Sequence, residues 1–258
     1  MKLGICTGPE NMQLAAELGY DYIEWALNAI AAMPQERFEA LREQAPNFPV
    51  PLAKCNCFLP GELHPTGPDV SESSLRAYLE KAFSRAHALG VKLVVFGSGG
   101  ARQVPQGFSH GEAWRQIADF LRLAGEYAQK YDIDIAIEPL RRKECNILNF
   151  VSEGTMMAAL VNHPRVGVLG DSFHMLCGHE PWEALRFAGK NLMHVHISHA
   201  LPDLSGRDYP APGDGTDYGE ILGLLKDMGY AGGVSIEAGT KDLAKDAAKA
   251  MACLKPLL

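Results

Sequence analysis

The stretch from Ile133 to Asn146, I-D-I-A-I-E-P-L-R-R-K-E-C-N, contains the pattern that decides the fold. Its first half is short, β-branched and mostly apolar, which is typical of a strand buried on both faces of a parallel sheet. Pro139 should end the strand, because proline cannot donate a hydrogen bond to a neighbouring strand. A carboxylate, Glu138, stands immediately before this proline. A charged side chain at the exit of a buried strand is a candidate functional residue.

The same pattern recurs three times downstream, at residues 166–171 (V-G-V-L-G-D), 192–196 (L-M-H-V-H) and 233–237 (G-V-S-I-E). Each apolar run carries an oxygen or imidazole ligand at its C-terminal end. Any one of these side chains could be an ordinary solvated or hydrogen-bonded group. Four ligand-type residues at four successive strand ends instead predict one common site, formed by Glu138, Asp171, His196 and Glu237.

Strands and helices alternate along the whole chain. Apolar runs predict strands at residues 2–6, 20–24, 50–54, 91–96, 133–138, 166–171, 192–197 and 233–237. Helical spacing and end signals predict helices at residues 11–18, 34–44, 72–89, 110–130, 152–161, 181–190, 217–228 and 241–254, with Ser152 as the N-cap of its helix. This strict alternation favours a closed (β/α)8 barrel, the TIM barrel, over an open sheet. We expect a single domain spanning residues 1–258.

A barrel has a direct consequence for the four ligand-type residues. The C-terminal ends of all its strands open into one mouth, so side chains from distant parts of the sequence can converge there. Three carboxylates and one imidazole form a hard, oxygen-rich ligand set. The sequence therefore predicts one divalent metal ion, with Mn²⁺, Mg²⁺ or Co²⁺ preferred and Zn²⁺ not excluded.

Composition narrows the class of partner. The chain has 258 residues, of which 47% are hydrophobic and 21% charged, so it can bury a large core. Its formal charge of −7 and pI near 5.7 disfavour binding to nucleic acid or to an anionic membrane, and favour a small-molecule substrate. Six cysteines, no recognisable signal peptide and no apolar run of membrane-spanning length predict a reduced, cytoplasmic protein.

Several other residues have alternative interpretations. His194 lies two residues before His196 on the same strand face, so we expect a hydrogen-bonded histidine one layer deeper in the barrel. Glu24 ends the second strand and could either line the pocket or pair with a nearby basic group. Three long loops, at residues 56–70, 97–109 and 198–216, are expected to surround the pocket, the second of them as a lid or a pocket wall.

These motifs also resemble a known family. The segments I-E-P-L-R-R-K-E-C-N, G-D-S-F-H, H-V-H-I-S and V-S-I-E occur in that order, with A-P-G-D-G-T-D-Y before the helix at 217–228. Across essentially the whole chain the sequence resembles the xylose isomerase-like barrels. Within them it is most similar to the metal-dependent sugar and sugar-phosphate isomerase/epimerase group that includes the ketose 3-epimerases.

The resemblance implies roles for individual residues. It implies that Glu138, Asp171, His196 and Glu237 hold one divalent ion, and that Glu144 and His174 contact the hydroxyl groups of a sugar. An arginine normally follows the metal-binding histidine in this family. Pro202 occupies the usual spacing here, and Arg207 is the nearest candidate for that substrate-binding role. Relatives are often dimers or tetramers, so the resemblance also implies a homo-oligomer.

The chemistry can also be argued from the residues. Moving a proton at a carbon next to a carbonyl requires a base near that carbon and a positive centre near the oxygens, where the charge of an enediolate develops. Glu138 and Glu237, on opposite sides of a bound ketose or sugar phosphate, could remove the proton from one face and return it to the other, which is epimerisation. Return of the proton to the adjacent carbon is isomerisation.

Three alternatives stay open. A dehydratase acting on an inositol-type keto-polyol could use the same ion and the same base, but would release water. An apurinic endonuclease of the same superfamily would need three zinc ions, extra histidines and an Asp-x-His element. Residues 212–218 contain Asp214 and Asp217 but no such histidine, and the acidic pI also argues against binding to DNA. A sugar-binding barrel without catalytic activity is the third alternative.

Overall fold

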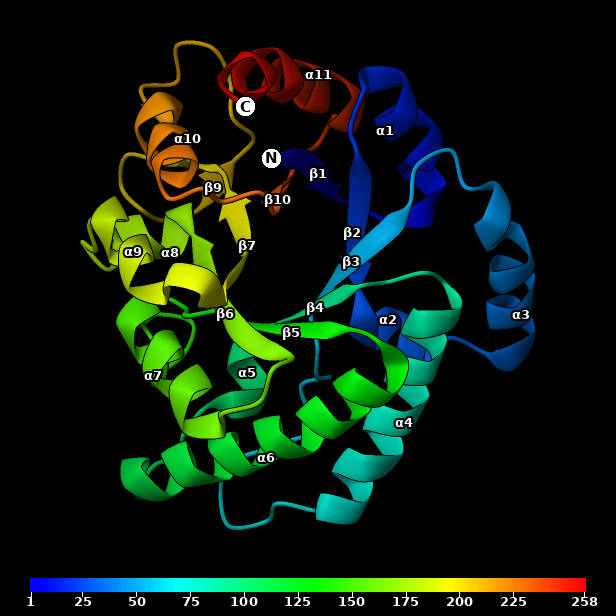
Figure 1. Ribbon diagram of the computed structural model, residues 1–258, viewed down its shortest axis with the longest axis vertical. Helices are drawn as coiled ribbons and strands as arrows, with labels where there is room; N and C mark the ends of the chain where they lie inside the picture. Colours follow the sequence, from blue (N-terminus) through cyan, green and yellow to red (C-terminus); the bar gives the residue numbers. More distant parts are fainter.

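The computed structural model describes residues 1–258 and contains a closed barrel of parallel strands surrounded by helices (Figure 1). The order of strands around the barrel is β1-β10-β7-β6-β5-β4-β3-β2, and pairing of β1 with β10 closes it. The predicted TIM barrel is confirmed. The barrel strands are β1 (Lys2–Cys6), β2 (Tyr22–Ala26), β3 (Leu52–Asn56), β4 (Leu93–Phe96), β5 (Asp134–Ile137), β6 (Val166–Asp171), β7 (Leu192–Ile197) and β10 (Gly233–Ile236).

The helices pack around the outside of the barrel. They are α1 (Met12–Leu18), α2 (Leu27–Ala32), α3 (Gln35–Gln44), α4 (Glu72–Ala88), α5 (Gly99–Arg102), α6 (His110–Tyr131), α7 (Val151–Val161), α8 (Ser172–Cys177), α9 (Leu185–Ala188), α10 (Tyr218–Asp227) and α11 (Leu243–Leu254). Short 3-10 turns lie at Pro9–Asn11, Ala45–Asn47, Trp182–Ala184, Gly189–Asn191 and Lys255–Leu257. None of these helices combines the length and the apolar character that crossing a membrane requires.

Helix α6 illustrates how local sequence sets an element. The hydroxyl of Ser109 accepts a hydrogen bond from the backbone N–H of Glu112, which caps the start of the helix. Ile117, Leu121 and Ala124 are buried at helical spacing, so one face of the helix packs on the barrel. The helix ends at Asp132, which adopts the left-handed conformation.

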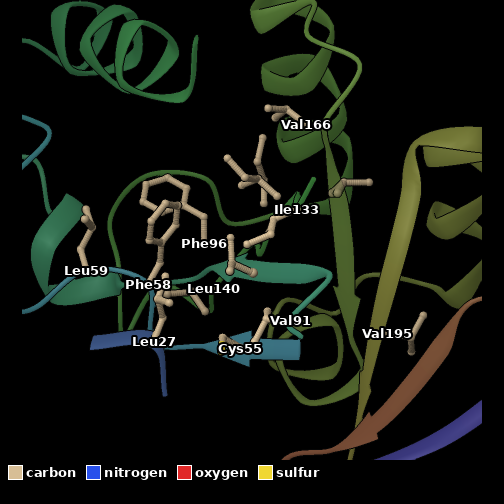
Figure 2. Close-up of a cluster of buried hydrophobic side chains, with 14 of the residues drawn as sticks. Leu27, Cys55, Phe58, Leu59, Val91, Phe96, Ile133, Leu140, Val166 and Val195 are labelled. Carbon is tan, nitrogen blue, oxygen red and sulfur yellow. The ribbon is translucent and has the colours of Figure 1, made fainter. Parts of the chain in front are cut away.

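The hydrophobic core lies mainly between the strands and the surrounding helices. Phe58 packs edge-on against Phe96 and Phe83 in this layer, and Figure 2 shows Phe58 and Phe96 together. A smaller group of buried residues, Leu93, Val95, Ala136 and Leu169, forms a separate cluster. Ala136 precedes Glu138 by two positions and Leu169 precedes Asp171 by two. Because side chains alternate along a strand, both carboxylates share a face with this inner cluster.

Several predicted boundaries need correction. Strands β2 and β3 both begin two residues later than predicted, and β3 starts directly after Pro51, which cannot donate to the sheet. The predicted N-cap at Ser152 is wrong. Helix α7 begins at Val151 after Phe150, and its first N–H is bound by the carboxylate of Glu180, which comes from a segment far along the chain.

The two loops after β4 and β7 are more ordered than predicted. Residues 97–109 include helix α5, where Arg102 is completely buried and donates hydrogen bonds to the carbonyls of Phe96 and Glu138. Arg102 therefore anchors this segment to the ends of β4 and β5. Residues 198–216 include a small antiparallel sheet, formed by β8 (His199–Ala200) and β9 (Arg207–Asp208). The helix predicted at 181–190 is broken into two 3-10 turns and the short α9.

Candidate metal centre

The four ligand-type residues predicted from the strand ends come together at the C-terminal mouth of the barrel. One ligand atom from each of Glu138, Asp171, His196 and Glu237 lies within 4.8 Å of the others. Glu138 and Glu237 directly follow β5 and β10, Asp171 ends β6, and His196 lies in β7. These strands are consecutive around the barrel, so the four side chains come from one side of its wall.

His196 lies at the centre of this cluster. Its Nδ1 atom is 3.0 Å from Glu237 Oε2, 3.1 Å from Glu138 Oε1 and 3.7 Å from Asp171 Oδ2. Its other ring nitrogen, Nε2, faces the opposite way and lies 2.9 Å from Glu24 Oε1. One nitrogen of the imidazole therefore faces three carboxylates, while the second is held by a fourth.

Glu24 supports His196 from below. Its second oxygen, Oε2, is 2.8 Å from His194 Nε2, and His194 Nδ1 is 2.9 Å from the carbonyl of Gly233. Glu24, His194 and His196 all have an exposed fraction of 0%. Burial alone would raise the pKa of Glu24, but the two histidines outweigh it and hold the pKa well below its usual range. Of the two interpretations of Glu24, pairing with a nearby base is the correct one, and His194 is the expected core histidine.

The surroundings of the cluster shift the pKa values of its carboxyl groups in different directions. Burial, reinforced by the charge of Glu237, raises the pKa of Glu138. Burial also acts against ionisation of Asp171, but Arg207 and His174 outweigh it and lower the pKa of Asp171. For His196, burial is overcome by Glu237 and Glu24, which raise its pKa well above the usual range. Three carboxylates thus face one imidazole at this end of the barrel.

Arg207 reaches into this cluster from the β8–β9 hairpin. Its Nη1 atom donates to Asp171 Oδ2 at 2.8 Å, and its Nη2 atom lies 2.8 Å from Glu237 Oε2. Arg207 is the first arginine after His196 and thus lies at the mouth of the barrel. It comes later in the sequence than the usual spacing, where Pro202 stands.

His174 and Glu144 lie beside the cluster and not within it. His174 is buried in α8, whose first turn is capped by Asp171, and its Nδ1 atom accepts from the backbone N–H of Arg141 at 3.3 Å. Glu144 is exposed, and its carboxylate binds the guanidinium of Arg141 at 2.6 Å. Through Arg141 the structure brings the two predicted substrate-binding residues close to each other.

Two further residues at strand ends escaped the sequence analysis. The side-chain amide of Asn56, at the end of β3, donates to Glu237 Oε1 at 3.3 Å. Cys6 ends β1 and lies beside Glu24 and His196 in a second group of potential ligands. Their position at the C-terminal end of a strand is the same signal that identified the four predicted ligands.

The arrangement fits a divalent ion. Glu237 Oε2 is buried, and its short contacts with Arg207 and His196 lie outside hydrogen-bond geometry. Arg207 already pairs with this oxygen electrostatically, and a bound ion would add a direct ligand bond to it. Three carboxylates and one imidazole are also the donor set that hard or borderline divalent ions prefer.

Comparison with known proteins places this fold in one class, the xylose isomerase-like TIM barrels. The sequence profile described as "Xylose isomerase-like TIM barrel" matches residues 12–257. The chain therefore belongs to the xylose isomerase-like TIM barrel family, and the predicted family is confirmed.

Particular relatives are sugar 3-epimerases. A probable ketose 3-epimerase of Synechocystis is 28% identical over 169 residues, a match that spans 63% of this chain but only 55% of that relative's length. The D-psicose 3-epimerase of Agrobacterium fabrum is 26% identical over 237 residues, covering 89% of this chain and 78% of the relative.

Among solved structures, D-allulose 3-epimerase from Methylomonas sp. in complex with D-allulose has a similar fold. Its TM-score is 0.86 at 22% identity, and the comparison covers 100% of this chain and 97% of that one. The predicted class of enzyme, a sugar isomerase or epimerase, is confirmed at the level of these relatives.

Proposed function

We propose that the protein is a divalent-metal-dependent epimerase or isomerase of a ketose or ketose phosphate, with epimerisation next to the carbonyl as its reaction. The observation that carries this proposal is the convergence of Glu138, Asp171, His196 and Glu237 within 4.8 Å at the mouth of the barrel. The 3-epimerases among its relatives support the choice of reaction.

The four converging residues would hold the ion. When bound, a divalent ion supplies positive charge that stabilises negative charge developing on substrate oxygens. Arg207 adds a fixed positive charge on the same side of the mouth, since it already faces Asp171 and Glu237. We infer that Arg207, His174 and Glu144 bind substrate hydroxyl groups, because they border the cluster and carry hydrogen-bonding atoms of both kinds.

Glu138 and Glu237 would carry the proton. They come from β5 and β10, which are separated around the barrel by β6 and β7, so the two carboxylates approach the centre from different directions. One can remove a proton from one face of the carbon next to the carbonyl, through an enediolate, and the other can return a proton to the opposite face. Burial and the charge of Glu237 raise the pKa of Glu138, whereas for Glu237 burial is outweighed by His196 and Arg207, which lower its pKa, so the two carboxyl groups differ in their affinity for a proton.

Loss of water from a keto-polyol is the alternative outcome of the same first step. It would begin with the same removal of a proton, but a hydroxyl would then leave. The named relatives do not favour it. Turnover in deuterated water separates the two reactions, because epimerisation places one deuterium on the reacting carbon and leaves the formula otherwise unchanged.

The variant Glu237→Gln tests the role of the acid–base pair. It removes a proton-transferring group while keeping the size of the side chain, so kcat on a ketose panel should fall by roughly 10²–10⁴-fold. Circular dichroism should show an unchanged fold. Glu220→Gln, an exposed position on α10, is the matched control and should behave as wild type. Near-normal turnover by Glu237→Gln would remove this residue from the proposed mechanism.

A further inference from the structure

A cavity shares one residue, Arg207, with the surroundings of the candidate metal centre. It lies between the β8–β9 hairpin, the segment after Glu237 and helix α11, and its volume is about 600 Å³. We call it the hairpin recess; its polar lining includes His199, Arg207, Asp208, Asp214, Lys241 and Lys249. This volume is within the range of roughly 300–1,000 Å³ found for small-molecule pockets.

The hairpin recess is connected to the metal centre through two elements. Arg207 lines the recess while its guanidinium contacts Asp171 and Glu237. Gly239, two residues after Glu237, also lines it, and a Cβ atom added at this glycine would meet no atom within 4 Å. Arg207 and the segment after Glu237 therefore border both the metal centre and the recess, and the space beside residue 239 is open.

The charges of the recess indicate what could occupy it. Its ionisable lining includes three basic side chains, Arg207, Lys241 and Lys249, and three acidic ones, Asp208, Asp214 and Asp246. The guanidinium of Arg207 is already engaged by two carboxylates of the metal centre. The recess as a whole therefore offers no net positive charge to a phosphate dianion, and its carboxylates would repel one.

A mixture of donors and acceptors suits hydroxyl groups instead. A hydroxyl both donates and accepts, so it can bind a carboxylate and an ammonium group at the same time. Asp214 and Asp246 are already bound by the hydroxyls of Tyr218 and Thr240. Asp208, Lys241 and Lys249 are exposed side chains at the rim and can bind a ligand.

We propose that the hairpin recess binds a neutral polyhydroxylated extension of the substrate, such as a sugar unit linked glycosidically to the ketose. The inference rests on the proposed function, since it assumes that the reacting ketose sits at the metal centre. It makes a glycosylated ketose, and not a phosphorylated one, the preferred substrate class.

The test compares three probes on the wild-type holoenzyme: a ketohexose, the same ketohexose with a glucosyl group on the terminal hydroxyl remote from the carbonyl, and its phosphate ester at that position. We expect kcat/KM for the glucosyl compound to exceed that for the free ketose by about tenfold, the effect of one or two added hydrogen bonds. The phosphate ester should show no such advantage.

Filling the recess should abolish the preference. In Gly239→Trp the indole enters the open space beside residue 239, so the ratio of kcat/KM between glucosyl and free ketose should fall to about one. The matched control is Ala231→Trp, which lines a different cavity of about 540 Å³ next to the start of β10 and should leave the ratio unchanged. If Gly239→Trp does not fold, Lys249→Met takes its place. It removes a donor from the exposed face of α11 and should lower the ratio of kcat/KM between glucosyl and free ketose at least threefold.

Three results would overturn the proposal: no advantage for the glucosyl compound, a clear advantage for the phosphate ester, or an unchanged ratio in both recess variants. In each case turnover of the free ketose would leave the proposed function intact. Absence of turnover with every ketose would instead contradict the proposed function itself, and the inference with it.

Discussion

His196 shows how one side chain can organise a site. Its Nδ1 atom faces the three carboxylates of the candidate metal centre, and its Nε2 atom is fixed by Glu24. Because Glu24 is ionised and buried, it orients the ring and makes the imidazole a stronger ligand. Glu24, which holds the ring of His196 in place, therefore lies one layer below the candidate metal centre in the barrel.

Replacement of Glu24 tests this arrangement. Glu24→Gln keeps the shape of the side chain but removes the charge beneath His196, so the affinity for Mn²⁺ should fall by roughly 10–100-fold. Isothermal titration calorimetry on EDTA-treated protein measures this change. Glu126→Gln, an exposed position on α6, serves as the control. Equal affinities in Glu24→Gln and wild type would show that Glu24 has only a structural role.

The sequence was sufficient to predict that the four ligand-type residues converge, but not which residue supports them. Glu138, Asp171, His196 and Glu237 could be predicted because each ends a strand, and strand ends meet in a barrel. Glu24 reaches His194 and His196 across β1 and β10, which separate β2 from β7. Such a contact depends on the closed geometry, so the sequence left pairing and pocket lining as equal alternatives.

At the scale of elements, the segment after β4 shapes the metal centre without contributing a ligand. Gly97 directly follows this strand and lies so close to Glu138 that an added Cβ atom would overlap Glu138 Oε2. A side chain at this position would therefore displace the carboxylate. The absence of a side chain at residue 97 therefore allows the Glu138 carboxylate to take its position in the cluster.

The variant Gly97→Ala should weaken the metal centre while leaving the barrel folded. Its methyl group must push the Glu138 carboxylate aside, so Mn²⁺ affinity should fall by about tenfold or more. Gly100→Ala, in the adjacent helix α5, is the matched control, because its Cβ atom would meet nothing within 4 Å. Calorimetric titration of both variants with Mn²⁺ measures the two affinities. Identical affinities in Gly97→Ala and Gly100→Ala would mean that the Glu138 carboxylate can move aside without loss of metal binding.

Helix α5 contributes through Arg102. The guanidinium donates to the carbonyls of Phe96 and Glu138 and lies near that of Leu148, so it ties together the ends of β4 and β5 and the loop that follows β5. Helices α5 and α8 and the β8–β9 hairpin escaped the sequence analysis. Each is shorter than the stretch of sequence that is needed to recognise a hydrophobic period.

Loss of Arg102 should be costly. In Arg102→Met the carbonyls of Phe96 and Glu138 lose the guanidinium as a donor inside the core, and Phe96 keeps only the backbone N–H of Glu138, so the free energy of unfolding should fall by about 3 kcal/mol. Urea denaturation measures it. The control Arg37→Met, on the exposed face of α3, should change stability by less than about 0.5 kcal/mol. A similarly small change in Arg102→Met would show that water replaces the guanidinium.

At the scale of the whole molecule, barrel closure brings the site together. The ligands are spread from residue 138 to residue 237, yet β5, β6, β7 and β10 are consecutive in the barrel wall. Strand alternation made this topology predictable. The pocket walls were less predictable, because residues 97–109 and 198–216 take their structure from contacts with other segments, such as Arg102 with Glu138 and Arg207 with Asp171.

The most direct test of a shared ion is anomalous X-ray diffraction from crystals of the protein grown with Mn²⁺. We predict a single strong manganese peak within coordination distance of Glu138, Asp171, His196 and Glu237. A peak bound by other residues, or no peak at this cluster at saturating Mn²⁺, would contradict the proposal that these four side chains form a metal centre.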